Sequence, residues 1–132
     1  MLLKLRDNVF LGDKDAFSVP ADLKAYGITA VIVVANEMKL IPENEAEGIK
    51  IFRLGLDAKR FNPAHHKDLA CHTAKYMVQN GENVLIQSVT GLRRGAYVVS
   101  RMICEIENKS IYEIFQEIKD KMPEFEMDLA YL

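Results

Sequence analysis

The chain has 132 residues, the length of one compact domain, and 49% of them are apolar and 27% charged, as in an ordinary soluble globule. Its formal net charge of −2 lacks the basic excess that is typical of general nucleic-acid binding. The longest apolar run, residues 28–35, is too short to span a bilayer, and charged residues appear too early for a secretory signal peptide. We therefore expect a cytoplasmic protein that forms a single domain over residues 1–132 and binds neither membranes nor, as a general function, nucleic acid.

The first half of the chain has the patterns of short strands and one short helix. We expect strands at residues 2–5, 8–13, 28–35 and 49–56, and one or two helical turns at residues 20–27. Pro20 suits the first position of a helix, and Gly27 suits the position after its end. The run at 28–35 is continuously apolar and rich in β-branched side chains. It therefore predicts a strand that is covered on both faces and lies at the centre of a sheet.

The second half of the chain alternates helices with one further strand. We expect a helix at residues 63–80, a buried strand at 84–87, a helix from Arg94 that includes Ile106, and a helix at 110–122. On the first of these helices we place one apolar face formed by Leu69, Thr73, Tyr76 and Met77. Ser110 and Glu113 stand at capping-box spacing, and Pro123 ends the last helix. The alternation predicts an α/β layer architecture around a central sheet.

The segment VLIQSVTGLRRGAYVV, residues 84–99, leads from the buried strand into a helix through a short loop. The free N–H groups and the dipole of a helix N-terminus favour an anion, and successive N–H groups in such a turn form a concave nest. Gly91 allows a tight turn, and Arg94 can donate two parallel hydrogen bonds to phosphate oxygens. The loop therefore predicts a cradle for phosphate or sulfate, formed by Ser88, Val89, Thr90, Gly91, Leu92, Arg93 and Arg94.

Other kinds of loop fit these residues less well. A Walker A loop needs Gly-Lys-Ser/Thr, and no lysine follows Gly95. A dinucleotide-binding loop needs a third glycine at closer spacing. The simplest alternative is an ordinary strand-to-helix turn with an exposed pair of arginines, since one glycine and one arginine are a weak signal by themselves.

Residues 87–95, QSVTGLRRG, resemble the signature loop of the dual-specificity and tyrosine phosphatases. That signature is His-Cys, two residues, Gly, two residues, Arg, and then Ser or Thr. Gly91 and Arg94 match it at the correct spacing. Together with Val89 and Leu92 they also match the loop of the phosphatases of regenerating liver, which likewise lacks the Ser or Thr after the arginine.

The resemblance extends over most of the domain. Residues 8–17 and 23–35 resemble the family's opening, residues 53–63 the loop that supplies its general acid, and residues 110–123 its closing helix. It implies a cysteine-phosphatase fold, in which a central, mostly parallel sheet has helices on both sides and the phosphate loop lies between a central strand and a helix. It also implies Ser88 at the nucleophile position, Arg94 as the phosphate ligand and Asp57 at the general-acid position, and we expect no cofactor and no metal.

Three departures from the family pattern lie inside the signature. Serine stands at position 88 for the cysteine, Gln87 for the histidine and Gly95 for the Ser or Thr. In the family a thiolate attacks phosphorus, and loop amides and the helix N-terminus lower the pKa of that thiol. A serine hydroxyl keeps its proton near neutral pH unless a base removes it, and the sequence suggests no such base. We therefore expect the chain to bind phosphate but to be inactive, or nearly so, as a phosphatase.

Two interpretations of Ser88 stay open. In one, the protein is a natural pseudophosphatase that binds a phosphorylated protein or another phosphate ester. The additional departures at Gln87 and Gly95 favour this interpretation. In the other, the protein is an active phosphotyrosine or phosphoserine phosphatase whose native cysteine was replaced by serine. A third possibility on the same fold is an RNA 5′-phosphate or phosphoinositide phosphatase. It has less support, since phosphoinositide members tend to have lysines in the loop and this loop has none.

Several side chains around the loop allow both a functional and an ordinary interpretation. Asp57 is either the proton donor of the family resemblance or a solvated loop aspartate. Arg93 is expected to point outward, toward the surroundings of a ligand or simply into solvent. Lys59 and Arg60 flank Asp57 and either add positive charge to the rim of the site or are solvated.

The histidines and cysteines suggest no metal site. His65, His66 and His72 lack the i, i+4 spacing of a helical metal pair. Cys71 and Cys104 form no C-x-x-C motif, and in a reducing compartment they are expected to be free core thiols.

Overall fold

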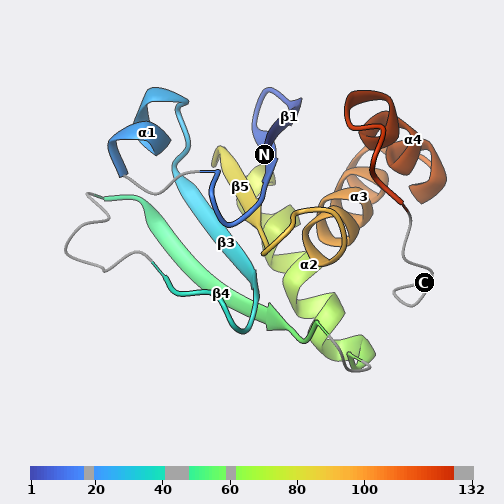
Figure 1. Cartoon of the computed structure of the whole chain (residues 1–132), viewed down its shortest axis with the longest axis horizontal. Helices are drawn as coiled ribbons and strands as arrows, with labels where there is room; N and C mark the ends of the chain where they lie inside the picture. Colours follow the sequence, from blue (N-terminus) through green and yellow to red (C-terminus); the bar gives the residue numbers. More distant parts are fainter. Residues whose placement is uncertain (17–19, 41–47, 59–61, 127–132) are drawn as a thin grey trace.

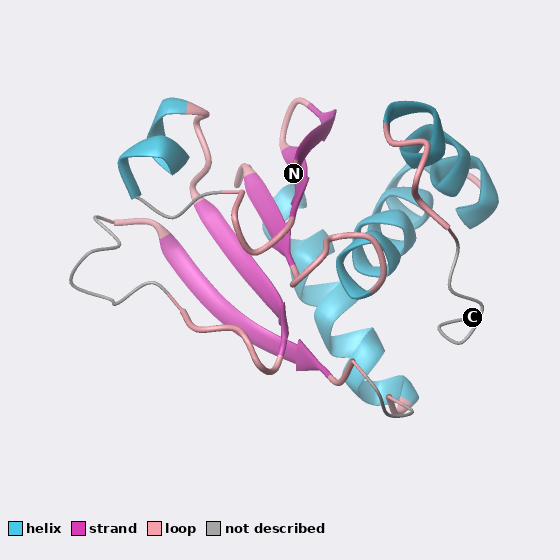
Figure 2. Ribbon diagram, in the orientation of Figure 1, coloured by secondary structure: helices cyan, strands magenta, loops and turns pink. Residues whose placement is uncertain are grey.

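The structure is a computed structural model that describes residues 1–16, 20–40, 48–58 and 62–126. A five-stranded sheet has the order β1-β2-β5-β3-β4 (Figures 1 and 2). Its strands are β1 (Leu2–Arg6), β2 (Val9–Gly12), β3 (Ala30–Ala35), β4 (Lys50–Leu56) and β5 (Val84–Gln87). Among the described strands, β1 and β2 pair antiparallel, and the other three pairings are parallel. The expected central, mostly parallel sheet is thus confirmed, although its first strand is antiparallel.

Helices cover the two faces of the sheet unequally. They are α1 (Pro20–Ala25), α2 (Ala64–Gln79), α3 (Arg94–Glu107) and α4 (Ile111–Lys121). The helices α2 and α3 pack on one face and α4 packs against α3, whereas the short α1 lies over the other face (Figure 1). No helix in the described part of the chain is long and apolar enough to cross a membrane.

The central strands are buried on both faces, as their continuous apolar sequence predicts. In β5, Val84 and Ile86 belong to the large core under α2 and α3, whereas Leu85 belongs to the smaller core on the other face. The second core includes Leu23 of α1 together with residues of β2 and β3. Packing on both faces fixes the position and direction of β5 in the sheet, and therefore the position of the loop that follows it.

The predicted apolar face of α2 is wrong at two of its four positions. Leu69 and Tyr76 are 56% and 66% exposed, whereas Met77 is buried and Thr73 is half-buried. The face that packs on the core is formed by Ala70, Cys71, Ala74, Met77 and Val78. The small side chains of Ala70 and Ala74 bring the helix close to its neighbours, and Leu69 and Tyr76 lie on the outer face.

The hydroxyl of Ser110 caps the N-terminus of α4, as expected. Its Oγ accepts a hydrogen bond from the N–H of Tyr112 at 3.2 Å, while the N–H of Glu113 donates to the Ser110 carbonyl at 3.0 Å. The cap is therefore present, but it engages the second residue of the helix rather than the third, as a capping box would.

Candidate functional site

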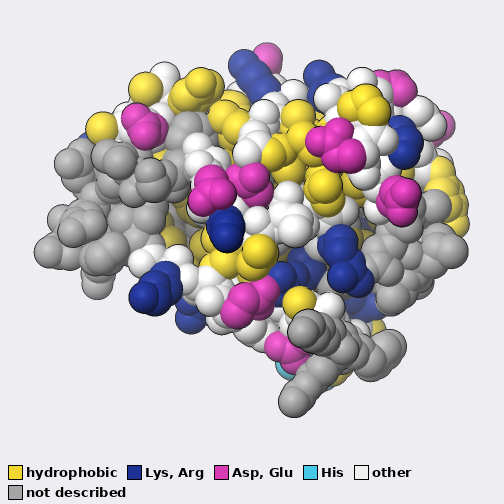
Figure 3. Space-filling view, in the orientation of Figure 1, with side chains coloured by type: hydrophobic (Ala, Val, Ile, Leu, Met, Phe, Trp, Pro, Cys, Tyr) yellow, Lys and Arg dark blue, Asp and Glu magenta, His cyan; other side chains and the backbone are white. Residues whose placement is uncertain are grey.

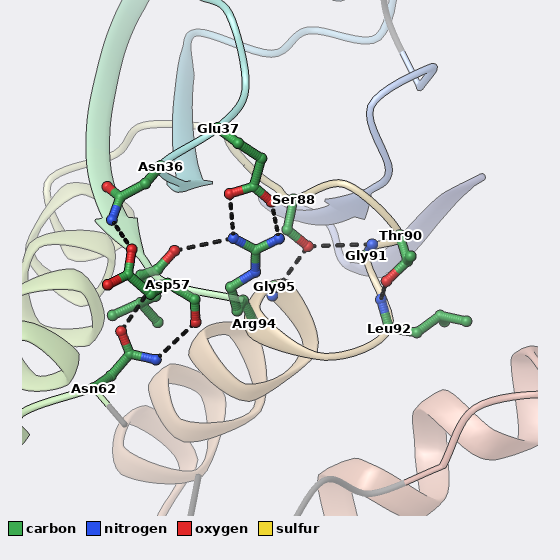
Figure 4. A network of polar contacts seen from close by, with 11 residues as sticks. Asn36, Glu37, Asp57, Asn62, Ser88, Thr90, Gly91, Leu92, Arg94 and Gly95 are labelled. Atoms are coloured by element: carbon green, nitrogen blue, oxygen red, sulfur yellow. Dashed lines mark hydrogen bonds and ion pairs between the residues drawn. The ribbon is translucent and has the colours of Figure 1, made fainter. Parts of the chain in front are cut away.

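The predicted loop lies at the carboxyl end of the sheet's middle strand. Strand β5 ends at Gln87, helix α3 begins at Arg94, and β5 has the parallel strands β2 and β3 as neighbours. Open α/β sheets commonly bind ligands at such a strand end. The turns after β3 and β4 reach the same edge of the sheet, so side chains from three strand ends meet around the loop (Figure 4).

Two N–H groups converge on the side chain of Ser88. This residue is only 1% exposed, and its Oγ accepts hydrogen bonds from the N–H groups of Gly91 and Gly95, both at 3.2 Å (Figure 4). Gly95 lies in the first turn of α3, where N–H groups carry partial positive charge. Both distances are at the long end for an oxygen acceptor, so the cradle is slightly wide for a hydroxyl.

Close approach requires glycine at positions 91 and 95. Gly91 has a φ of +76°, and a Cβ there would lie 3.1 Å from the Gly12 carbonyl oxygen and would overlap the Met1 side chain. A Cβ at Gly95 would lie 2.8 Å from Ser88 Oγ. The glycine at 95 thus lets the first turn of α3 contact the side chain of residue 88.

Hydrogen bonds to the segment after β2 hold the loop in place. The Val89 carbonyl accepts from the N–H of Lys14 at 3.1 Å, and Gln87 Nε2 donates to the Asp13 carbonyl at 2.9 Å. Within the loop, Thr90 Oγ1 accepts from the N–H of Leu92 at 3.2 Å. Gln87, at the family's histidine position, therefore has a structural contact of its own.

Several donors of the loop are available to a ligand. The N–H groups of Val89, Thr90 and Arg94 have no hydrogen-bond partner within the described ranges. The side chain of Arg93 is exposed and that of Leu92 is half-buried. These N–H groups and the exposed Arg93 side chain border the candidate site.

Arg94 is buried and held by a carboxylate that the sequence analysis did not identify. Its Nη1 donates to Glu37 Oε2 at 2.8 Å and to the Leu56 carbonyl at 3.0 Å, and its Nη2 donates to Glu37 Oε1. The hydrogen bonds from Arg94 lower the pKa of Glu37 to about 2. The guanidinium edge formed by Nε and the second N–H of Nη2 has no partner among the described residues, and in Figure 4 it is turned toward Ser88.

Asp57 directly follows β4 and is held by two asparagines. Its Oδ1 accepts from Asn36 Nδ2 at 2.7 Å. Its N–H donates to Asn62 Oδ1 at 2.8 Å, and its carbonyl accepts from Asn62 Nδ2 at 3.0 Å. In Figure 4, Asp57 and Ser88 lie on opposite sides of Arg94, and no contact joins Asp57 to either of them in the described structure.

The loop and Asp57 were expected from the sequence, whereas Asn36, Glu37 and Asn62, which contact Asp57 or Arg94, were not. Asn36 and Glu37 follow β3, whose carboxyl end lies at the same edge of the sheet as those of β4 and β5. Because ligands of open α/β sheets commonly bind at the carboxyl ends of strands, polar residues directly after the predicted strand at 28–35 could have been considered as site residues. Apart from the position of Asn62 before Pro63, nothing in the sequence indicated that its side chain would contact Asp57. Lys59 and Arg60 lie outside the described residues.

The cysteines and histidines stand apart from the loop. Burial raises the pKa of the Cys71 thiol to about 12, and it also raises the pKa of half-buried Cys104. Both are free thiols, as expected, and neither is an activated nucleophile. Among the residues that the structure describes, no three His, Cys, Asp or Glu side chains are grouped to hold a metal ion.

Comparisons with known proteins identify relatives over the whole chain. No family model matches it. It is 25% identical over 130 residues to dual specificity protein phosphatase 12 of Rattus norvegicus, an alignment that covers 98% of this chain and 38% of that protein. The chain thus spans well under half the length of this relative.

Several solved structures have the same fold. Human DUSP28 matches with a TM-score of 0.79 and 23% identity, over 98% of this chain and 86% of that one. PTPMT1 in complex with PI(5)P matches with a TM-score of 0.83 and 18% identity, over 99% and 89%. A mouse putative dual specificity phosphatase complexed with zinc tungstate matches with a TM-score of 0.80 and 22% identity, over 98% and 80%. These likenesses confirm the fold that the sequence analysis predicted.

Proposed function

Because this chain has the fold of the dual-specificity and tyrosine phosphatases, we propose that its loop from Ser88 to Arg94 binds the phosphate group of a phosphate ester. The observation that carries the proposal is the set of donors left over in the loop. Three backbone N–H groups and one edge of the Arg94 guanidinium have no partner among the described residues. A buried arginine and several amides at one helix N-terminus match the charge and geometry of a phosphate group.

We also propose that the chain, with serine at position 88, does not hydrolyse the ester. Ser88 Oγ accepts two N–H groups and contacts no histidine or carboxylate in the described part of the chain. A serine nucleophile needs a base to take its proton, and nothing around Ser88 supplies one. The protein would then act as a phosphate-recognising module rather than as an enzyme.

A second candidate function is an active phosphatase with cysteine at position 88. The cradle favours it, because N–H···Oγ distances of 3.2 Å leave room for the larger sulfur atom. The same two N–H groups and the helix N-terminus would stabilise a thiolate. This candidate requires Asp57 as the proton donor to the leaving group.

We propose a phosphorylated protein as the ligand class, acting in the cytoplasm. Basic and acidic side chains are interspersed on the described part of the face in Figure 3, which does not favour a nucleic-acid backbone as the partner. A phosphoinositide has less support than a phosphoprotein, since Val89, Thr90 and Leu92 supply no lysine to the loop. An RNA 5′-phosphate is a further candidate on the same fold.

The proposal is tested by measuring oxyanion binding calorimetrically with tungstate and with inorganic phosphate. We expect the parent chain to bind both ions and Arg94→Ala to lose affinity by about 10- to 150-fold, the equivalent of about 1.5–3 kcal/mol for a charged hydrogen-bond partner. Arg93→Ala is the matched control, because this neighbouring arginine is exposed, and it should change the affinity much less. Absence of binding, or equal losses for the two variants, would overturn the proposal.

A further inference from the structure

The turn after β3 reaches across to β4 through Asn36. The side chain of Asn36 donates to Asp57 Oδ1 at 2.7 Å, and its backbone N–H donates to the Leu56 carbonyl at 3.3 Å. The same carbonyl accepts from Arg94 Nη1 at 3.0 Å. One short turn thus links the general-acid position to the phosphate-binding arginine.

The strand beside this turn is shaped to accept the Asn36 side chain. The β3–β4 pairing shifts between Val33, opposite Arg53, and Ala35, opposite Leu56, so β4 contains one extra residue there. Such bulges re-aim side chains and are common next to active sites. A Cβ at Gly55, within this bulge, would lie 2.6 Å from Asn36 Cγ and would overlap Asn36 Oδ1. The bulge and the glycine together make room for a single amide group.

The remaining contacts of Asp57 leave one carboxyl oxygen available. Asn62 holds the backbone N–H and carbonyl of Asp57, and Asn36 holds Oδ1. Oδ2 has no hydrogen-bond partner among the described residues. Because an amide N–H already occupies Oδ1, a proton on this carboxyl group belongs on Oδ2.

We propose that Asn36 is a positioning residue that orients Asp57 to deliver a proton from Oδ2 to the leaving group. The inference rests on the proposed phosphate site and concerns the chain with cysteine at 88. In that reaction a bond forms between the thiolate sulfur and phosphorus, and the bond between phosphorus and the ester oxygen breaks. The ester oxygen keeps the electron pair and takes the proton from Oδ2, which leaves Asp57 as a carboxylate. The amide of Asn36 can donate to Oδ1 before and after the transfer, so it holds the group without being consumed.

The test compares two esters in the Ser88→Cys background. One ester has an activated phenol that leaves without protonation, and the other has an alcohol that must be protonated. We expect Asn36→Ala to lower kcat for the second ester by about 10- to 100-fold, the usual effect of a small misplacement of a reacting group. Activity on the first ester should stay within about twofold. Gly55→Ala should act in the same direction, because its methyl group displaces the Asn36 amide.

Gln116→Ala is the matched control. Gln116 donates a side-chain N–H to Asp120 Oδ1 at 2.8 Å in an exposed contact of α4, so Gln116→Ala removes the same kind of contact from a helix that contributes no residue to the loop. In an Asp57→Asn background, Asn36→Ala should cause no further loss. Equal losses on the two esters, or a further loss without Asp57, would show a merely structural role and overturn the inference.

Tungstate binding distinguishes a failure of the proposed phosphate site from a failure of the positioning role of Asn36. If Ser88→Cys binds tungstate but hydrolyses neither ester, the phosphate site stands and the positioning role is overturned. If the chain as given binds no tungstate, the proposed function fails, and the positioning role fails with it.

Discussion

At the scale of single residues, the three departures from the phosphatase signature have different structural meanings. Gln87 donates to the Asp13 carbonyl at 2.9 Å and thereby braces the loop. Gly95 places an N–H group 3.2 Å from Ser88 Oγ, and any Cβ there would lie 2.8 Å from that oxygen. Two of the departures are therefore built into the packing of the loop. At Ser88, a hydroxyl stands in place of the thiol on which the family's reaction depends.

The pairing of Glu37 with Arg94 predicts a pH-dependent contribution to stability. The pKa of Glu37 falls from 4.5 to about 2 in the folded chain, so the pairing stabilises the fold above about pH 4.5 and its contribution is lost as the pH falls toward 2. Glu37→Gln should therefore lower the free energy of unfolding at pH 7. The loss should be about 1 kcal/mol or less, because the Glu37 side chain is 49% exposed.

Denaturant unfolding at several pH values measures this difference. The difference in the free energy of unfolding between the parent chain and Glu37→Gln should be constant between pH 7 and about 5 and should decrease at lower pH. A difference that stays the same down to pH 3 would contradict the stabilising role of the Glu37–Arg94 ion pair, because it would show that the carboxylate charge does not cause the stabilisation.

At the scale of elements, hydrophobic periodicity predicted where strands and helices lie but not always which face of a helix is buried. The strand at 28–35 and the helix at 63–80 correspond to β3 and α2 within a few residues. The face of α2 was wrong because large apolar side chains were taken as its core contacts, whereas Ala70 and Ala74 make the close approach. Periodicity does not record how near two elements come, and that distance decides whether small or large side chains fill the contact.

This difference between the two faces of α2 can be tested by substitution. Ala74→Leu adds three carbon atoms to a fully buried position and should lower the free energy of unfolding by about 1–3 kcal/mol. Tyr76→Ala removes a much larger side chain from the outer face, where it is 66% exposed, and should change stability by less than about 0.5 kcal/mol. Chemical denaturation of both variants gives the comparison, and a larger loss for Tyr76→Ala would contradict the observed face.

At the scale of the whole molecule, the site exists because β3, β4 and β5 are parallel neighbours. Their carboxyl ends bring Glu37, Asp57 and the loop from Ser88 to Arg94 to one edge of the sheet. The loop and Asp57 could be predicted because each has a local motif that resembles a known family. Glu37 and Asn36 could not be singled out in this way, because their roles depend on strand order and on the bulge in β4, which no local pattern in the sequence records.

If the second candidate function holds, Ser88→Cys alone should give the chain phosphatase activity, because the N–H groups around residue 88 are in place. In Ser88→Cys, the N–H groups of Gly91 and Gly95 should lower the pKa of the new thiol below its usual value of about 8.5. Turnover of an aryl phosphate should then rise with pH as the thiolate forms.

Asp57→Asn in the Ser88→Cys chain should lower the rate by about 10²- to 10⁴-fold for a leaving group that needs protonation. The parent chain with Ser88 should show no turnover, and Ser88→Ala should match it. A Ser88→Cys chain that binds tungstate as tightly as its parent and yet remains inactive at every pH would favour a dedicated binding module. In that case Gln87 and Gly95 would matter for chemistry as well as for packing, and adding Gln87→His should raise the rate only at the expense of the hydrogen bond to Asp13.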